Sequence, residues 1–263
     1  MKKTDTLKEI VFKKKEKLSL AKQQLSQEEL KSRILSLQPT VRFREAISKP
    51  RQISLIAEIK NASPSSGIIR NDFNHIEIAR DYQNAGVQAI SVLTEEDYFL
   101  GNLAYLKEVK NLTALPVLRK DFILDSYQIY ESRLYGADAV LLIAGLLTQE
   151  ELAEFSSLAL SLGMDSLVEV HDEKELKKIL KLKSISLIGI NNRNLHTLDV
   201  DFKTVERLFP LIPKEKTVVV ESGIKTSQDV LFLKILGVSA CLIGTAFMQS
   251  ENIPKKIEEI MGW

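Results

Sequence analysis

Five apolar segments of this sequence each end in a lysine, a glutamate or an asparagine. The polar residues at or near these ends are Glu58, Lys60, Lys120, Glu169, Asn191 and Glu221. A charged group is costly to bury unless it is paired or takes part in chemistry. If the segments are parallel strands, their carboxyl ends converge and enclose a pocket that holds two lysines and three glutamates. Such a set is suited to general acid–base catalysis.

A buried lysine can donate a proton, hold an anion or form a Schiff base, and an opposed glutamate can act as the base. We expect proton-transfer chemistry on a carbonyl compound. Three alternatives stay open: a Schiff-base aldolase that uses Lys60 or Lys120, a structural ion-pair network, and a barrel that only binds its ligand. The histidines His75, His171 and His196 are not at metal-ligand spacing, so we expect no metal site.

Eight short apolar runs separated by helical patterns carry these residues. The runs begin near Ile53, Gln88, Pro116, Ala137, Ser166, Ile185, Thr217 and Ala240. Helical periodicity is found at 76–85, 126–135, 148–162, 173–182 and 227–236, several of which are followed by glycine. Residues 148–151 (Thr-Gln-Glu-Glu) form a capping-box pattern. Alternation of strands and helices predicts parallel strands with right-handed crossovers, and eight such units predict an α/β fold, the closed (β/α)8 TIM barrel.

Alternation along a strand decides which side chains share a face. Glu58 and Lys60 are two residues apart, so both can point into the barrel while Ala57 and Ile59 face the helices. By the same spacing, Glu169 shares its face with Leu167 and His171. The two lysines and three glutamates all fall on the first, third, fifth and seventh runs, so they can occupy adjoining levels at one mouth of the barrel. With Arg193 counted, the mouth holds three cations against three anions, so its net charge is close to zero.

Small residues follow the last two strands. Ser222 and Gly223 come after the seventh, and Gly244 and Thr245 come after the eighth. Small residues let backbone N–H groups approach an anion, and this fold commonly binds phosphate at these two loops. Lys60 and Ser63 of the first loop could complete the site. The sequence has neither a Gly-x-Gly-x-x-Gly motif nor a Gly-Lys-Ser/Thr loop, so nucleotide binding has no support.

Residues 1–50 do not follow the repeat. They are helical in pattern, with a second capping-box pattern at 26–29, and residues 1–20 hold seven lysines against three acidic residues. We expect a single barrel domain over 1–263 with an N-terminal helical extension, 1–50, packed on the barrel near its mouth. Two interpretations of its lysines stay open: they form a helix face exposed to solvent, or some of them help to attract an anionic substrate.

Composition excludes several classes of protein. The chain has 263 residues and a net charge of +1, which disfavours nucleic-acid binding. No apolar run approaches the ~18 residues that a membrane helix needs, and no secretory signal is recognisable. The single cysteine, Cys241, permits no internal disulfide and fits a reducing compartment. We therefore expect a cytoplasmic protein without a membrane partner.

Taken together, the motifs resemble those of the indole-3-glycerol-phosphate synthase family of tryptophan biosynthesis. The resemblance runs from about residue 5 to the end of the chain and rests on Phe99 and Gly101 and on the segments EIKNASPSSG (58–67), LTE (93–95), RKDFI (119–123), LVEV (167–170), GINNRNL (189–195), ESGI (221–224) and LIGT (242–245). It departs in three places: Ser66 stands where relatives often have lysine, Arg119 where a hydrophobic residue is common, and Asn192 and Asn194 in a loop where serine and aspartate are frequent.

The resemblance implies a cofactor-independent carboxy-lyase. It would close the indole ring of 1-(2-carboxyphenylamino)-1-deoxyribulose 5-phosphate with loss of carbon dioxide and water. Lys120 would be the general acid and Glu169 its acid/base partner, Lys60 would contact the substrate carboxylate, and Glu58, Asn191 and Glu221 would orient and polarise the site. The substrate and phosphate contacts would be Ser63, Pro64, Phe99, Phe122, Arg193, Ser222, Gly223, Gly244 and Thr245. We expect a phosphosugar substrate, no cofactor, and a monomer or weak homodimer.

Overall fold

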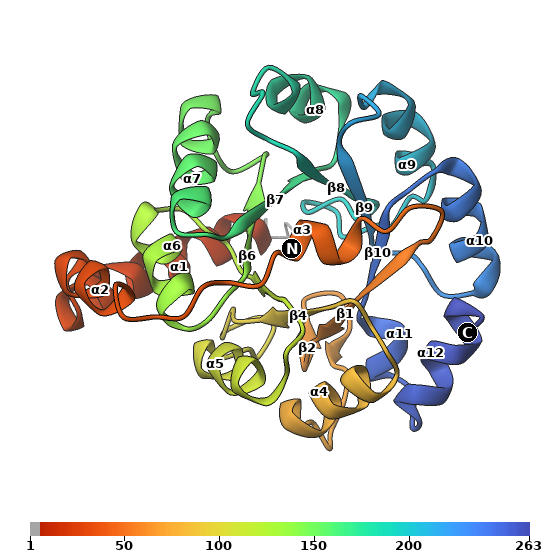
Figure 1. The fold of residues 1–263 in the computed structure, drawn as a ribbon, viewed down its shortest axis with the longest axis horizontal. Helices are drawn as coiled ribbons and strands as arrows, with labels where there is room; N and C mark the ends of the chain where they lie inside the picture. Colours follow the sequence, from red (N-terminus) through yellow and green to blue (C-terminus); the bar gives the residue numbers. More distant parts are fainter. Residues whose placement is uncertain (1–5) are drawn as a thin grey trace, which may run out of the picture.

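The computed structural model describes residues 6–263, and its centre is a closed barrel of parallel strands (Figure 1). The strands follow the order β1-β10-β9-β8-β7-β6-β5-β4 around the barrel. Their bounds are β1 Ser54–Ile59, β4 Ala89–Leu93, β5 Val117–Lys120, β6 Ala139–Ile143, β7 Asp165–Val170, β8 Leu187–Asn191, β9 Thr217–Glu221 and β10 Ala240–Ile243. Each of the eight predicted runs holds one strand, so the predicted (β/α)8 barrel is confirmed.

Helices surround the barrel. They are α4 His75–Asn84, α5 Leu103–Leu112, α6 Ser126–Leu134, α7 Gln149–Ser161, α8 Glu173–Leu180, α9 Lys203–Leu208, α10 Ser227–Leu236, α11 Thr245–Met248 and α12 Ile253–Met261, with the 3-10 turn η1 Phe209–Leu211 after α9. The five predicted helices are confirmed as α4, α6, α7, α8 and α10. Helices α5 and α12 were not predicted, although Asn102 and Asn252 cap them as N-cap residues normally do.

The two predicted capping boxes have different outcomes. At α7, Thr148 and Glu151 exchange both bonds of the box. Ahead of α2 (Gln27–Ile34), Ser26 accepts the bond from the Glu29 N–H, but the Glu29 carboxylate pairs with Arg33 at 2.6 Å. The second prediction was therefore half right. An exposed glutamate can pair with a cation one turn further on as readily as it can bond back to the cap.

Apolar residues form two layers that obey the strand alternation. Ile56, Leu118, Leu167 and Val219 pack inside the barrel. Their strand neighbours, such as Ala57, pack outside against the helices. The predicted facing of the first strand is thus confirmed, and it sends Glu58 and Lys60 to the inner side.

The N-terminal helices touch both ends of the barrel. Helix α1 (Thr6–Gln24) places Leu7 and Ile10 against the inner apolar layer near the carboxyl ends of the strands. Helix α2 lies beside α6, and α3 (Phe43–Ile47) lies across the barrel in Figure 1. Phe43 and Ile47 bury themselves among residues from the amino ends of the strands. Part of the predicted extension therefore lies at the opposite end from the mouth, and its residues 1–5 lie outside the described residues.

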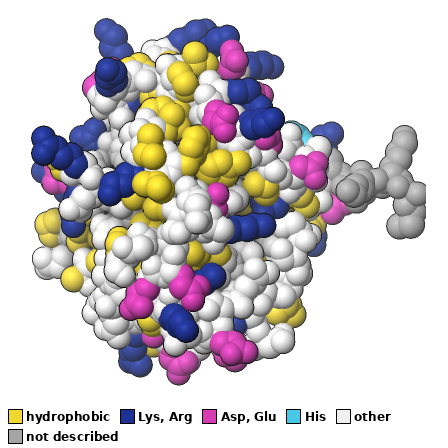
Figure 2. All heavy atoms as spheres, turned by 90° about the vertical axis from the view of Figure 1, so that its right-hand side faces the viewer, with side chains coloured by type: hydrophobic (Ala, Val, Ile, Leu, Met, Phe, Trp, Pro, Cys, Tyr) yellow, Lys and Arg dark blue, Asp and Glu magenta, His cyan; other side chains and the backbone are white. Residues whose placement is uncertain are grey.

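A small hairpin, β2 (Ala62–Ser63) with β3 (Gly67–Ile68), follows β1 at the mouth. Figure 2 shows the face of the molecule to which α10 belongs, where hydrophobic side chains lie among charged ones. Leu231 and Ile235 of α10 are 55% and 77% exposed. Within 6–263, no helix is both long and apolar enough to cross a membrane.

Candidate active site

A cavity of about 1060 Å³ opens at the carboxyl ends of the strands. All fifteen residues singled out from the sequence line it: Glu58, Lys60, Ser63, Pro64, Phe99, Lys120, Phe122, Glu169, Asn191, Arg193, Glu221, Ser222, Gly223, Gly244 and Thr245. The carboxyl-end face is where barrel enzymes carry their active sites. The cavity is therefore the candidate active site.

Lys120, at the end of β5, lies between two buried glutamates. Its Nζ is 3.4 Å from Oε2 of Glu169 on β7 and 3.2 Å from Oε2 of Glu221 on β9. These are alternate strands of the barrel, which is the arrangement that brings side chains into one interior layer. The three side chains are 15%, 1% and 2% exposed, so their charges interact with little screening by water.

The pKa values of the two glutamates are shifted in opposite directions. Burial raises the pKa of Glu221 to about 8, and the nearby charge of Glu169 adds to this while Lys120 opposes it. Burial also acts to raise the pKa of Glu169, but Lys120 and His171 outweigh it, so that pKa lies well below its usual range. The two carboxyl groups that flank Lys120 thus differ in how readily they bind a proton: Glu221 holds one more readily than Glu169 does. A separation of this kind marks acid and base roles.

Lys120 itself stays protonated. Burial lowers the pKa of its ammonium, but the charges of Glu221, Glu169 and Glu58 outweigh burial and hold the pKa well above its ordinary value. A Schiff-base lysine must be neutral to attack a carbonyl, and enzymes obtain one by burying it in an apolar pocket or beside another cation. The surroundings of Lys120 therefore favour a proton donor over an imine-forming nucleophile.

Lys60 and Glu58 form a second pair on β1 and its end. Lys60 Nζ lies 2.6 Å from Oε1 of Glu58. The same oxygen lies 2.5 Å from the position that a Cβ would take on Gly244. Gly244 therefore leaves the space that Glu58 occupies. The glycine was chosen from the sequence as a phosphate contact, and the structure gives it this additional packing role.

Gly189 leaves space for the side chain of Glu221, as Gly244 does for Glu58. A Cβ on this residue of β8 would lie 2.6 Å from Oε1 of Glu221. Next along the strand face, Asn191 is paired in register with Glu221 and its Oδ1 accepts a bond from the Arg193 N–H. Gly189 was quoted from the sequence without a role, because no local pattern shows which side chain fills the space above a glycine.

The loops after β9 and β10 offer a surface of small residues. Ser222 and Gly223 both have positive φ (65° and 84°), and the Asn192 side chain donates to the Ser222 carbonyl at 3.0 Å. A Cβ on Gly223 would also meet Val200 at 2.8 Å. Across the cavity mouth, Arg193 donates to the Leu198 carbonyl and to Ser65 of the β2–β3 hairpin. Consecutive backbone N–H groups in turn conformations, such as those of Ser222 and Gly223, form concavities that bind anions.

The opposite wall is aromatic and apolar. The rings of Phe99 and Phe122 are 6.2 Å apart between centroids. Leu7 and Ile10 of α1 join them on the cavity lining, together with Leu141 and Ile143 of β6. The contributions of α1 and β6 were missed from the sequence, which contains no signal for apolar residues that line a cavity instead of a core.

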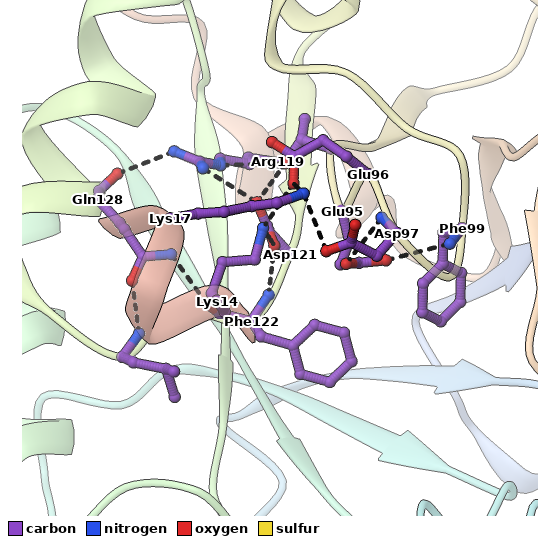
Figure 3. Close-up of polar contacts among 12 residues, drawn as sticks. Lys14, Lys17, Glu95, Glu96, Asp97, Phe99, Arg119, Asp121, Phe122 and Gln128 are labelled. Carbon is purple, nitrogen blue, oxygen red and sulfur yellow. Dashed lines mark hydrogen bonds and ion pairs between the residues drawn. The ribbon is translucent and has the colours of Figure 1, made fainter. Parts of the chain in front are cut away.

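A buried ion network holds this wall in place, as Figure 3 shows. Lys14 of α1 lies 2.8 Å from Asp121, the residue after Lys120, and Arg119 lies 3.0 Å from the same carboxylate. Burial acts to raise the pKa of Asp121, but Lys14 and Arg119 reverse this and lower it to about 2. Asp121 also accepts the N–H of Phe122. Arg119 points away from the barrel interior toward α6, which explains how a charge fits a position that is commonly hydrophobic.

The loop that carries Phe99 is fixed by a second carboxylate. Glu95 accepts the N–H groups of residues 97, 98 and 99. Within 6–263, the carboxylates of Glu95, Glu96 and Asp97 are close enough together to share a cation. However, Glu96 and Asp97 lie 3.1 and 2.9 Å from the ammonium of Lys17, which supplies the countercharge.

Comparison with known proteins places this geometry in a family. The model of the family described as indole-3-glycerol phosphate synthase matches residues 7–260. The chain belongs to the indole-3-glycerol phosphate synthase family. It is 45% identical over 254 residues to that synthase of Alkaliphilus metalliredigens, covering 97% of each chain. It is 52% identical over 222 residues to that of Caldanaerobacter subterraneus subsp. tengcongensis, covering 84% of this chain and 86% of the relative. The resemblance read from the sequence is confirmed.

Solved structures support the fold at lower identity. A mutant tryptophan synthase alpha-subunit from Pyrococcus furiosus has a TM-score of 0.62 at 15% identity and covers 80% of this chain and 98% of its own. KGPDC from Streptococcus mutans has a TM-score of 0.62 at 13% identity, with 78% and 93% coverage. At these identities the likeness shows the barrel fold alone.

Proposed function

We propose that this chain closes the indole ring of 1-(2-carboxyphenylamino)-1-deoxyribulose 5-phosphate to give indole-3-glycerol phosphate, carbon dioxide and water. The observation that carries the proposal is the position of Lys120 between Glu169 and Glu221, on the wall of the cavity and almost out of contact with water. The reaction needs a proton donor at a carbonyl oxygen and a base nearby, and these groups supply both.

Lys120 acts first in this mechanism. Its ammonium donates a hydrogen bond and then a proton to the substrate carbonyl oxygen as the aromatic ring carbon attacks the carbonyl carbon. The new carbon–carbon bond then allows the carboxylate to leave as carbon dioxide, with its bonding electrons returned to the ring. The hydroxyl formed from the carbonyl leaves as water once Lys60, the second candidate donor, has given it a proton. Glu169 takes the proton that the ring system must lose, and the indole results.

The other residues bind and orient the substrate. Lys60 contacts the substrate carboxylate and is a second candidate donor, with Glu58 fixing its ammonium. Phe99 and Phe122 receive the aromatic ring. The phosphate binds the backbone of Ser222–Gly223 and Gly244–Thr245, aided by Ser63, while Pro64 and Arg193 close the mouth. Asn191 supports Glu169, and Glu221 polarises Lys120. The reaction as written calls for no cofactor or metal.

Purified protein and synthetic substrate test the proposal directly. We expect a rise in indole fluorescence, with release of one carbon dioxide for each indole-3-glycerol phosphate formed. Tight binding of the substrate without product would contradict catalysis and would favour a binding module. Treatment with borohydride during turnover should leave no mass adduct on Lys60 or Lys120. An adduct would favour the aldolase-type alternative.

The substrate class, the cellular compartment and the oligomeric state are also part of the proposal. A small phosphosugar is the substrate, and the chain works in the cytoplasm as a monomer or weak homodimer without nucleic-acid partners. Residues 1–50 and the barrel act as one domain, supported by the Lys14–Asp121 pair that joins them. Light scattering of the purified chain measures the oligomeric state.

A further inference from the structure

We propose that His171 and Glu175 are positioning residues for the base of the reaction: the imidazolium of His171, held by Glu175, keeps Glu169 ionised and turned toward Lys120. This rests on the proposed function to the extent that Glu169 takes up a proton there. The spacing of the sequence places His171 on the same strand face as Glu169 but gives it no role.

The four side chains form a row of alternating charge. Glu175 Oε2 lies 3.0 Å from His171 Nδ1, and His171 Nε2 lies 3.1 Å from Glu169 Oε1. The other oxygen of Glu169, Oε2, lies 3.4 Å from Lys120. The two oxygens of one carboxylate thus face two different cations. Rotation of the Glu169 carboxylate would lengthen both ion-pair contacts, so the two cations together favour its present orientation.

Glu175 in turn is fixed by its own surroundings. Its Oε2 also accepts the backbone N–H of His171 at 2.8 Å. Its Oε1 lies 2.5 Å from the position of a Cβ on Gly145, so any larger residue there would displace the carboxylate. The Glu175 N–H is bound by Asp172, the N-cap of α8. The imidazole is therefore held from its outer side by a carboxylate that has little freedom to move.

His171 acts through Glu169 and does not reach the substrate. Glu169 lines the substrate cavity, whereas His171 lines a second cavity of about 510 Å³ behind it. The charged and titratable groups that face His171 are Glu169 and Glu175 in contact, and Asp172, Lys8, Lys15 and His196 on the walls of the second cavity. The two carboxylates in contact dominate, because charges across the cavity are screened by solvent.

The protonation of the pair agrees with the geometry. Burial acts to lower the pKa of His171, but Glu169 and Glu175 outweigh it and raise the pKa to about 10. The imidazolium is therefore present throughout the neutral range. Its removal takes away one of the two cations that oppose the burial of Glu169, so the pKa of Glu169 rises. A larger fraction of Glu169 is then protonated at low pH and unable to act as a base.

The test compares kcat and KM of His171→Asn, Glu175→Gln and Gly145→Ala with those of the unaltered enzyme from pH 5.5 to 9. For His171→Asn we expect kcat to fall about 10-fold at pH 6 and less at pH 8, with KM changed less than about twofold. Glu175→Gln and Gly145→Ala should show the same pH dependence with smaller losses. His75→Asn is the matched control, since it breaks a His–Glu pair between α4 and α5, away from the cavity.

The outcomes separate positioning from structural support. An acidic limb of kcat that moves to higher pH in His171→Asn supports the proposal. A loss of kcat that is equal at all pH values, or a profile that superimposes on that of the unaltered enzyme, overturns it.

Imidazole NMR of the unaltered protein provides a readout that does not depend on turnover or on the folding of a variant. The chain has three histidines, and His75→Asn assigns one of them. His171 should remain protonated on both nitrogens at pH 8, and a neutral ring at pH 7 would overturn the proposal. If the chain fails to turn over the ribulose phosphate, the proposed function fails, while this spectrum still tests the His171–Glu169 contact.

Discussion

The ammonium of Lys120 lies 3.2 Å from Glu221 Oε2, and the other oxygen of Glu221 occupies space that Gly189 leaves open. Lys120 comes from β5, Glu221 from β9 and Gly189 from the strand beside it, β8. The contact therefore depends on closure of the barrel around a small residue. It also places the ammonium beside a carboxyl group whose pKa burial raises, while the ammonium itself acts to lower that pKa.

Replacing Lys120 tests the proton donor. In Lys120→Met we expect kcat to fall by about 10²–10⁴-fold, the usual contribution of one general acid or base, while the protein stays folded. Indole fluorescence measures kcat and circular dichroism monitors the fold. Lys174→Met, on the exposed side of α8, is the control and should keep full activity. Near-normal turnover of Lys120→Met would remove Lys120 from the mechanism.

Replacing Glu169 tests the base. Glu169→Gln keeps the size of the side chain but cannot accept a proton, so kcat should again fall by about 10²–10⁴-fold. Because Lys120 and Glu169 act as a unit, the double variant should lose much less than the product of the two single losses. Independent, multiplicative losses in the double variant would mean that the two groups serve different steps.

The raised pKa of Glu221 predicts that stability falls with rising pH. Its pKa is about 8 in the folded protein, against an ordinary value of 4.5. Between these values the folded state binds a proton that the unfolded state has lost, so the free energy of unfolding decreases as pH rises. Glu221→Gln cannot ionise and should flatten this decline by an amount on the order of a few kcal/mol at most. Urea unfolding of both proteins at pH 5, 7 and 9 checks it, and parallel curves would contradict the raised pKa.

Lys14 couples the first helix to the site. Removing the only partner of a buried charge costs about 3–5 kcal/mol. Lys14→Met leaves Asp121 with Arg119, so the loss of stability should be smaller than this. We expect a lower midpoint of urea unfolding and a raised KM, because Asp121 binds the N–H of Phe122 on the cavity wall. Lys15→Met, at the exposed neighbouring position, is the control. A variant with normal KM would leave the helix with a purely structural role.

Replacing Gly244 tests why this position is a glycine: to leave room for Glu58, or to let a phosphate approach the backbone. In Gly244→Val the Cβ would collide with Glu58 as well as narrow the proposed phosphate site, so both kcat and KM should worsen. Inorganic phosphate as a competing ligand distinguishes the contributions. Weakened phosphate binding supports the loop as a phosphate site, whereas normal phosphate binding with a lowered kcat would assign the residue to the placement of Glu58.

The sequence by itself determined the barrel, the strands and the inner face of each functional residue. Period-2 alternation fixes which side of a strand Glu58, Lys120 or Glu169 occupies, and parallel strands bring their carboxyl ends to one mouth. These are properties of short segments, so they can be read from the chain before it folds. The family motifs added the expected substrate.

Only the tertiary structure decided which charge meets which. Lys14 reaches Asp121, and His171 rather than a second lysine lies behind Glu169, because these contacts depend on how the closed barrel places its side chains. The spaces beside Gly189 and Gly244, and the placement of α3 at the end opposite the mouth, also arise only when the barrel closes. Protonation follows from the same cause: the pKa of a carboxyl depends on burial and on neighbouring charges in space, which no local pattern specifies.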